Sequence, residues 1–319
     1  MIRHSLLVTT FVSFLSLAVS SALSAELTAE KNDQGVTIKI DGQPFAEYLI
    51  NSKSKPIVWP IIGPTGTKMT RDYPLIEKVE GESKDHPHHR SLWFTHGEVN
   101  GVDFWTEVDK PGGKIGKTVH RDFIQVAGGK EAIVATRNDW VGPDGKRVCA
   151  DERTLTFGGD QNQRWIDFAI TIKATDGPVA FGDTKEGTFG LRVPDTMKVD
   201  AKKGGKIVDS AGQVGEGLIW GKPSPWIDYS GPVGGETLGI AILNHPSSFR
   251  YPTAWHVRAY GLFAANPFGK KDFKIEQQGP YTLPSGESVT FRYRVIFHKG
   301  DEKAAKIADA FAAYQKADK

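Results

Sequence analysis

The feature that most constrains the fold is a long succession of short segments in which apolar and polar residues alternate. The pattern is clear in GVTIKI (35–40), RVCADERTLTF (147–157) and ESVTFRYRVIFHK (287–299). Alternation with period two places apolar side chains on one face of a strand and polar side chains on the other. Turn sequences such as DGQ, GPDGK and PSGES separate these segments. The order indicates consecutive antiparallel strands and not a βαβ fold.

One helix is predicted, at the end of the chain, over 301–316. Asp301 can cap it, and its apolar stripe at helical spacing is formed by Ala304, Ile307, Ala308 and Phe311. Roughly 15 or more strands are too many for a small sandwich. We therefore expect an all-β fold over residues 26–319: a single large antiparallel β-sandwich whose outer surface receives the C-terminal helix.

The N-terminus, MIRHSLLVTTFVSFLSLAVSSALSAEL, has the layout of a secretory signal peptide. Arg3 supplies the positive charge, a mostly apolar run follows, and small residues precede the expected cleavage after Ala25. The apolar run is short for a bilayer span and contains Ser and Thr, which disfavours a membrane anchor. We expect residues 1–25 to be a signal peptide, the mature protein to be secreted or periplasmic, and the mature chain to lack a membrane span.

Composition excludes several classes of function. Lys and Arg number 40 and Asp and Glu 38, for a formal net charge of +2, so a nucleic-acid partner is not expected. Cys149 is the only cysteine, which rules out an intrachain disulfide, and its alternating segment predicts a core position. The sequence has no phosphate loop, dinucleotide fingerprint or G-x-S-x-G elbow, so no cofactor is predicted. It does not indicate an oligomeric state.

The densest polar cluster is DHPHHRSLWFTHGEVNGVDFW (85–105), which holds four of the nine histidines. Pro87 favours an extended backbone at His86, and strand alternation would then direct His86, His88 and Arg90 to one face. Asn100-Gly101 is a hairpin signal, so we expect 88–98 to pair with 102–106. Trp93 and Trp105 could stack on a sugar ring, or they could pack in the core.

The histidines allow two interpretations. His86 and His88 with a distant third residue could bind a metal ion. Arg90 on the same predicted face is unfavourable beside a cation, so we assign no metal ligand and favour hydrogen bonding or acid/base chemistry.

Three later segments also carry candidate polar residues. Asp183, Lys185 and Glu186 precede an apolar stretch and could face a cleft or form a solvated turn. Asp228 and Tyr229 lie in a Pro-rich loop beside Trp226, and His245 precedes a proline. In WHVRAYGLF (255–263) strand alternation places three hydrogen-bonding side chains on one face: His256, Arg258 and Tyr260.

Two of these motifs, residues 85–105 and NHPSSFRYPTAWHVRAYGLFAANPFG (244–269), resemble the PmoA-like family of secreted bacterial proteins, often labelled methane oxygenase PmoA. The resemblance covers most of the mature chain. It does not imply methane oxidation, because the methane monooxygenase subunit of that name is an integral membrane protein and this sequence has no span after residue 25.

More distantly, THGEVNGVDFW (95–105) and LPSGESVTFRYRV (283–295) are similar to segments of the galactose mutarotase-like sandwiches. That resemblance implies the β-supersandwich fold and a carbohydrate cleft. The catalytic glutamate of those proteins has no clean counterpart, Glu276 being a weak candidate, so mutarotase activity is not implied.

The sequence therefore predicts a secreted protein with a small-molecule carbohydrate ligand and acid/base chemistry, either epimerisation, elimination or hydrolysis, on a sugar or sugar derivative. The predicted catalytic residues are His88, His89, Glu186 and His256. The predicted substrate-binding residues are Arg90, Trp105, Asp183, Lys185, Asp228, Tyr229, His245, Arg258 and Tyr260. The alternatives are a non-catalytic carbohydrate-binding module and a metal-dependent enzyme that uses His86 and His88.

Overall fold

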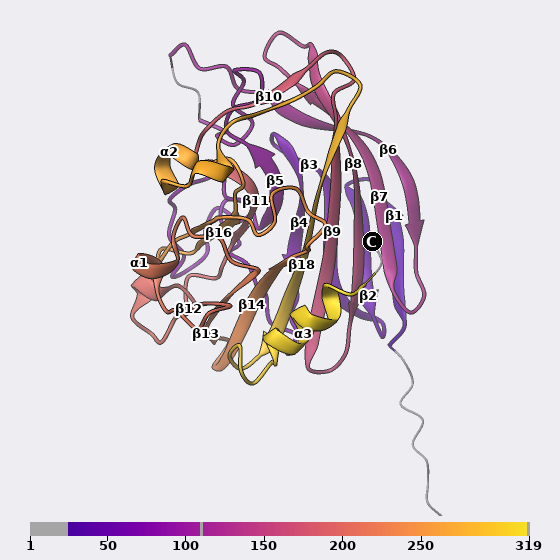
Figure 1. Ribbon diagram of the computed structural model, residues 1–319. Coiled ribbons are helices and arrows are strands. Elements are labelled where there is room, and N and C mark those ends of the chain that lie inside the picture. Colours follow the sequence, from indigo (N-terminus) through magenta and orange to yellow (C-terminus); the bar gives the residue numbers. More distant parts are fainter. Residues whose placement is uncertain (1–24, 109–110, 318–319) are drawn as a thin grey trace, which may run out of the picture.

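The structure is a computed structural model that describes residues 25–108 and 111–317 (Figure 1). The predicted signal peptide lies outside the described residues except for Ala25. Two eight-stranded sheets face each other, and the paired named strands are antiparallel. The predicted all-β sandwich is thus confirmed.

The first sheet has the strand order β1 (Leu27–Asn32), β2 (Gly35–Ile40), β3 (Gln43–Ser52), β4 (Lys55–Ile61), β5 (Leu92–His96), β11 (Gly187–Arg192), β16 (Leu262–Ala265) and β15 (Trp255–Val257). The second sheet has the order β12 (Lys206–Asp209), β13 (Trp226–Val233), β14 (Glu236–Asn244), β18 (Ser288–Lys299), β9 (Gln163–Lys173), β8 (Arg147–Gly159), β7 (Ala132–Val141) and β6 (Lys117–Ala127). A separate pair joins β10 (Val179–Phe181) to β17 (Tyr281–Leu283). The helices are η1 (Val199–Ala201), α1 (Glu216–Ile219), α2 (Lys270–Phe273), η2 (Glu276–Gln278) and α3 (Ile307–Tyr314).

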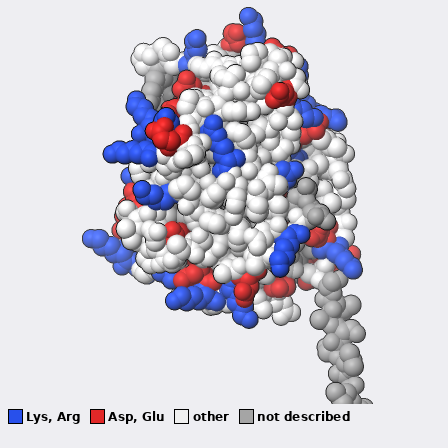
Figure 2. Space-filling view, viewed as in Figure 1, with Lys and Arg blue, Asp and Glu red and all other residues white. Residues whose placement is uncertain are grey.

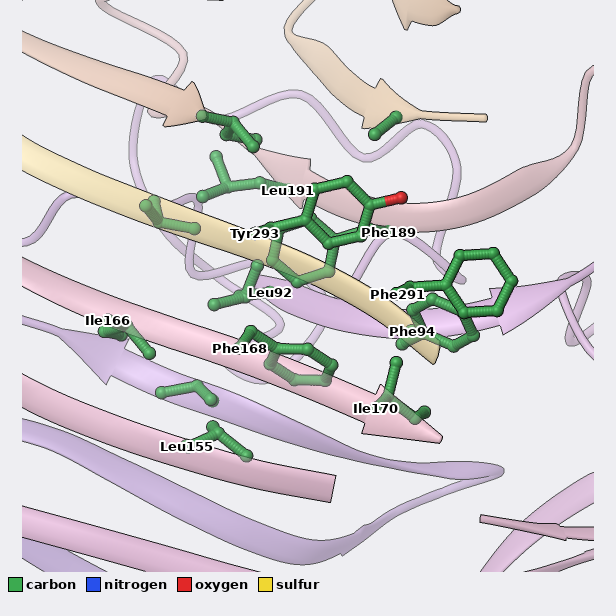
Figure 3. Packing of buried hydrophobic residues seen from close by; sticks show 14 of the residues in the cluster. Leu92, Phe94, Leu155, Ile166, Phe168, Ile170, Phe189, Leu191, Phe291 and Tyr293 are labelled. Carbon is green, nitrogen blue, oxygen red and sulfur yellow. The ribbon is translucent and has the colours of Figure 1, made fainter. Parts of the chain in front are cut away.

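The main core lies between the two sheets, and strand alternation builds it. In β18, Val289, Phe291 and Tyr293 are buried, whereas the intervening Thr290 and Arg292 are partly exposed. Figure 3 shows side chains of β5 and β11 packed against side chains of β8, β9 and β18. Cys149 is buried in this core, and burial raises the pKa of its thiol. The prediction that Cys149 is a core residue is confirmed.

The C-terminal helix is shorter than predicted. It begins at Ile307, because Lys306 adopts a left-handed conformation that interrupts a helix starting at Asp301. Ile307 and Tyr314 are buried in a small cluster on the outer face of the second sheet, with Phe311 partly buried beside them. Ala304 and Ala308, which we expected in the stripe, are exposed. The helix lies across β14 and β18 (Figure 1).

The predicted hairpin of 88–98 with 102–106 is wrong in extent. Only Leu92–His96 forms a strand, and Val99 and Val102 make an isolated bridge around the Asn100–Gly101 turn. The Asp103 carboxylate accepts hydrogen bonds from the backbone N–H groups of Trp105 and Thr106, at 2.8 and 2.9 Å. This local turn ends the strand pairing, as Asp side chains often do.

Charged residues of both signs are interspersed over the face that Figure 2 shows, which agrees with a net charge of +2. In the part of the chain that the structure describes, no helix is both long enough and apolar enough to cross a membrane.

Candidate functional site

A cavity of 360 Å³ lies on the outer face of the first sheet, near β5, β15 and β16. Its volume falls within the range of about 300–1,000 Å³ that is usual for small-molecule sites. Four stretches that are far apart in the sequence supply its walls. The lining residues are His86, His88, His89, Asp103, Trp105, Thr106, Lys185, Glu186, His256, Arg258 and Tyr260.

The first wall is a turn and not the strand that we predicted. The backbone N–H of His89 donates to the carbonyl of His86 at 2.9 Å, with Pro87 at the second position of the turn, where proline is favoured. Because the chain reverses here, His86, His88 and His89 all reach the cavity instead of alternating between two faces. The ring centroid of His88 is 4.5 Å from that of His89.

Aromatic rings form a stack beside the cavity. The centroid of His86 lies 5.0 Å from Tyr260 and 4.8 Å from His89, and His89 lies 5.4 Å from Trp93; these rings are parallel to within 20°. Trp105 packs against Trp93 at 5.1 Å. The predicted binding residue Trp105 lines the cavity itself, and we call the side that it forms the floor. Trp93 packs against Trp105 and supports this floor.

The opposite wall comes from β15 and the turn after it. Trp255 and Val257 point into the main core, so His256 between them points to the other face of the first sheet. The predicted strand over 255–263 is split after Val257, because Gly261, with φ +102°, donates to the carbonyl of Arg258 and closes a turn before β16. Arg258 and Tyr260 reach the cavity from this turn.

A buried cluster of charges lies behind the histidine turn. Arg192, whose side chain is fully buried, donates to both oxygens of Asp85 at 2.8 and 3.0 Å, and Arg71 also pairs with Asp85. Burial would raise the pKa of Asp85, but the His86 hydrogen bond and the two arginines outweigh it and hold that pKa well below its usual range. Asp85 is therefore ionised and fixes the turn in place.

Arg192 also determines the tautomer of His89. Its Nη1 lies 3.2 Å from Nδ1 of His89, and a guanidinium can only donate. Nδ1 of His89 is therefore the acceptor, which leaves the proton of the neutral ring on Nε2. That Nε2 has no hydrogen-bond partner among the described residues, and His89 lines the cavity.

A second buried cluster lies below the floor. Glu107 accepts from Lys55 at 2.8 Å and from Nε of Arg90 at 2.8 and 3.0 Å, and the Lys55 ammonium is 6.0 Å from the Trp93 ring centroid. Burial would raise the pKa of Glu107, but Lys55 and Arg90 outweigh it and lower that pKa. Arg90 is thus a structural partner of Glu107 and does not line the cavity, because the turn at 86–89 directs it inward.

Three of the cavity histidines, His88, His89 and His256, are held neutral near pH 7. Burial lowers the pKa of His88 to about 4, aided by Lys55 and His86, and lowers that of His89 well below its ordinary value. Burial also lowers the pKa of His256 to about 4, although Glu186 and the carbonyl of Lys185 partly offset this. Nδ1 of His256 donates to that carbonyl at 2.7 Å, so Nε2 keeps its lone pair.

Charged pairs form the rim. The Lys185 ammonium lies 3.0 Å from Oε1 of Glu186, and Nε of Arg258 lies 2.8 Å from Oε1 of Glu216. Glu186 is partly exposed, lines the cavity and acts electrostatically on both His88 and His256. The four predicted catalytic residues, His88, His89, Glu186 and His256, therefore line one cavity.

Besides Arg90, four predicted binding residues lie elsewhere. Asp183 accepts from the backbone N–H of Lys271 in α2, at 3.0 Å. Asp228 is buried on the outer face of the second sheet and pairs with His298 at 2.7 Å, because strand alternation in β13 turns it away from the core. His245 contacts Ser247 and the Tyr314 ring near α3. None of these three reaches the cavity.

Tyr229 is a core residue, since β13 alternation points it between the sheets. Its hydroxyl donates to the carbonyl of Ala259 at 3.1 Å and accepts from the backbone N–H of Val199 at 3.1 Å. Tyr229 therefore supports the turn that carries Arg258 and Tyr260 without contacting the cavity.

The sequence analysis missed Asp103, Thr106 and the supporting Arg192. A signal for Arg192 was present, because a charged residue within the wholly buried strand β11 requires buried partners. Asp103 stands beside the Asn100–Gly101 turn in the motif that we singled out, but nothing in the sequence shows that its loop reaches the cavity.

The metal-dependent alternative finds no ligand set in the structure. Within residues 25–108 and 111–317, no group of three or more His, Cys, Asp or Glu side chains is arranged to hold a metal ion. The ring centroids of His86 and His88, the pair named in this alternative, are 5.7 Å apart at an interplanar angle of 72°, and Nδ1 of His86 is already bonded to Asp85 at 2.9 Å.

Other cavities lack a comparable set of available groups. A 490 Å³ cavity over β7 and β8 is lined by Arg121, Arg137 and Arg147, each of which is already paired with a carboxylate. A 390 Å³ cavity beside His298 contains a histidine whose Nε2 is bound to Asp228. The cavity on the first sheet is therefore the candidate site.

Fold and site together define a β-sandwich protein with a histidine-rich cavity on the outer face of one sheet. The chain belongs to a family of unknown function, DUF6807, whose model matches residues 35–312. A search of curated proteins gave no significant match. The PmoA-like resemblance is not among these findings and stays a prediction.

Similar solved structures share little sequence with this chain. A β-arabinopyranosidase is 12% identical with a TM-score of 0.33, over 87% of this chain and 38% of that one. An α-galactosidase from Lactobacillus brevis is 8% identical with a TM-score of 0.41, over 88% and 40%. A galactose mutarotase related enzyme from Lactobacillus acidophilus is 10% identical with a TM-score of 0.27, over 86% and 95%. The chain spans about two fifths of the first two proteins, and likenesses this weak carry no argument about activity.

Proposed function

We propose that the protein binds a carbohydrate in this cavity and performs acid/base chemistry on it. The observation that supports this most strongly is the pair of neutral imidazoles with opposite tautomers: His256 offers a lone pair at Nε2, and His89 offers an N–H at Nε2. A sugar presents apolar ring faces and polar hydroxyls. Aromatic side chains such as Trp105 and Tyr260, mixed with polar groups, suit such a ligand.

In this proposal His256 is the general base. Its Nε2 takes a proton from a carbon or hydroxyl of the sugar, and the same proton can return from the resulting imidazolium. Glu186 stabilises that imidazolium, since its carboxylate already favours the charged form of His256. A histidine with a pKa of about 4 holds no acidic proton near pH 7, so His256 is proposed as the base and not as the acid.

His89 serves as the donor. Its Nε2–H stabilises negative charge that develops on a substrate oxygen as the proton leaves, as a neutral imidazole can do. His88, with its pKa lowered to about 4, adds a further neutral hydrogen-bonding group at the same wall.

This chemistry favours epimerisation or elimination over glycoside hydrolysis. Hydrolysis of a glycoside ordinarily uses two carboxyl groups that flank the bond. The lining carboxylates are Glu186 and Asp103, and Asp103 already accepts two backbone N–H groups. The catalytic pair proposed here is therefore an imidazole base with an imidazole donor.

We also propose that the protein is secreted or periplasmic after cleavage following Ala25. The first strand begins at Leu27, so this cleavage would leave the whole sandwich intact. Mass spectrometry of the exported protein should give a chain that starts at Glu26. The PmoA-like resemblance, whose two motifs supply the facing walls of the cavity, is compatible with this location.

The proposed function can be tested with a panel of mono- and disaccharides, including oxidised sugars, followed by NMR for turnover. His256→Asn keeps a donor for the Lys185 carbonyl but removes the Nε2 lone pair, so we expect turnover to fall by about 10²–10⁴-fold. Glu186→Gln should also lower turnover. His120→Asn, on β6 of the second sheet, is the matched control and should retain full activity. Full activity in both cavity variants would place the chemistry elsewhere.

A further inference from the structure

The cavity has an excess of fixed positive charge. The cluster behind the histidine turn has two cations, Arg71 and Arg192, for one carboxylate, Asp85. The cluster under the floor likewise has Lys55 and Arg90 for Glu107.

The remaining charges do not remove this excess. The Lys185–Glu186 and Arg258–Glu216 pairs each cancel. Asp103 lines the cavity and acts electrostatically on Lys55. The three histidines that burial holds neutral add no charge, so the cations of the two buried clusters outnumber the carboxylates that they pair with.

The floor also carries an unused donor. Trp105 is 1% exposed and lines the cavity, and its indole N–H has no partner among the residues that the structure describes. Nε2–H of His89 is a second donor without a partner there, and the two ring centroids are 5.8 Å apart. A buried donor without an acceptor is unfavourable, so a ligand oxygen at this place would stabilise the site.

We infer that the ligand is a sugar that bears a carboxylate, which lies against the Trp105 and His89 end of the cavity above the Lys55 cluster. The inference rests on the proposed function, because it names the class of carbohydrate that the same cavity takes. A carboxylate offsets the excess of cations in the two buried clusters and supplies acceptors for both donors. The sugar ring then extends toward His256 and Glu186, where the proton is removed.

A carboxylate in this position also serves the chemistry. A C–H bond next to a carboxylate or to a ring carbonyl loses its proton more readily when donors neutralise the charge that develops on oxygen. The end of the cavity rich in donors and the end that holds the base are supplied by opposite walls, the 86–105 region and β15. The ligand is thereby oriented with its acidic end toward the floor.

The inference can be tested by isothermal titration calorimetry with matched sugars. Galacturonate and glucuronate are compared with galactose, glucose and the methyl esters of both acids, using wild-type protein. We expect each acid to bind at least about tenfold more tightly than its neutral counterparts, because hydrogen bonds to a charged group are about twice as strong. Raising the salt concentration should narrow this difference.

Trp105→Phe keeps an aromatic ring but removes the N–H donor. We expect it to weaken binding of the acids about five- to tenfold more than it weakens binding of the neutral sugars. Trp226→Phe, under α3 on the other sheet, is the matched control and should change neither.

The outcomes separate the two proposals. If neutral sugars bind as tightly as the acids, the acidic-ligand inference is overturned, whereas the proposed function stands. If no sugar of either kind binds, both are overturned. The comparison of acids with esters uses wild-type protein, so the result does not depend on the folding of a variant.

Discussion

His256 owes its proposed role to its burial at the end of β15, where the ring gives its Nδ1 proton to the Lys185 carbonyl. A pKa of about 4 means that the ring loses its proton as pH rises through 4 and stays neutral above it. We therefore expect kcat/KM to rise with pH through about 4 and to be constant above about 5.5. A base with an ordinary histidine pKa would instead give a rise centred near pH 6.5.

The Glu186→Gln variant tests whether the pH profile belongs to His256. Glu186 raises the pKa of His256, and its removal should move the midpoint of the residual activity to lower pH. A midpoint near 6.5 in the wild type, or loss of the inflection in Glu186→Gln, would contradict the role of His256.

Arg192 is the residue that links the histidine turn to the first sheet. Its side chain is fully buried, so Arg192→Met leaves Asp85 with one arginine and frees the tautomer of His89. We expect a loss of about 3 kcal/mol in the free energy of unfolding, at the low end for a broken buried pair because Asp85 is partly exposed.

Urea unfolding measures this loss. The control is Arg121→Met, which breaks the ion pair between the half-exposed Arg121 and Asp139. It should lower the free energy of unfolding by less than about 1 kcal/mol. Equal losses in the two variants would show that Arg192 has no special structural role.

The structure brings four of the side chains that the sequence singled out to one cavity. His88, His89, Glu186 and His256 were chosen because histidines and a carboxylate interrupt apolar segments, and this composition does not depend on the exact backbone path. Asp228 and His245 failed because the same composition also marks buried pairs such as Asp228 with His298. A single sequence does not distinguish a carboxylate that faces a ligand from one that faces a buried partner.

At the scale of elements, β11 and β5 fix the position of the cavity floor. Gly190 of β11 pairs with Trp93 of β5, and a Cβ at Gly190 would lie 2.5 Å from Cζ2 of the indole. Gly190→Ala should therefore push Trp93 toward His89 and Trp105 and cost about 1–3 kcal/mol of stability.

Tryptophan fluorescence and urea unfolding together detect this change. The control is Gly217→Ala in α1, where a Cβ would meet no atom within 4 Å. If Gly190→Ala matches the wild type in both measurements, the close packing of Trp93 against β11 is not needed to form the floor.

Elements were predicted well where the pattern was periodic and poorly where turns intervened. The alternation in RVCADERTLTF and ESVTFRYRVIFHK gave strands that match β8 and β18 closely. The 86–89 segment was taken for a strand because Pro87 disfavours helix at the preceding residue. Proline also favours the second position of a turn, and the structure adopts that second option.

At the scale of the whole molecule, the folded sandwich buries histidines in their neutral form, and its free energy of unfolding should therefore depend on pH. His96 and His256 are almost fully buried, and burial lowers the pKa of each to about 4. In the unfolded chain both would titrate near 6.5. Between pH 6.5 and 4 the unfolded state therefore binds more protons than the folded state, and stability falls as pH falls.

A shift of this size corresponds to about 3 kcal/mol for each group. Urea unfolding from pH 7 to 4 should show this loss of stability. In His256→Asn, which lacks one of the two histidines, the free energy of unfolding should change less steeply with pH. Stability that stays constant or rises as pH falls over this window would contradict the buried neutral state.

The order of the strands and the pairing of the sheets could not be derived from the sequence. The class of fold follows from alternation within segments, whereas β5 pairing with β11, almost a hundred residues later in the chain, depends on packing between distant segments. The position of the cavity could not be predicted for the same reason, because its walls come from four such segments.

The central claim is that the cavity presents one imidazole N–H donor and one imidazole lone pair at neutral pH. The most direct test is ¹⁵N NMR of the histidine side chains at pH 7. We predict that His256 carries its proton on Nδ1 and His89 on Nε2, both as neutral rings. An imidazolium at either position, or the opposite tautomer at His256, would contradict the account.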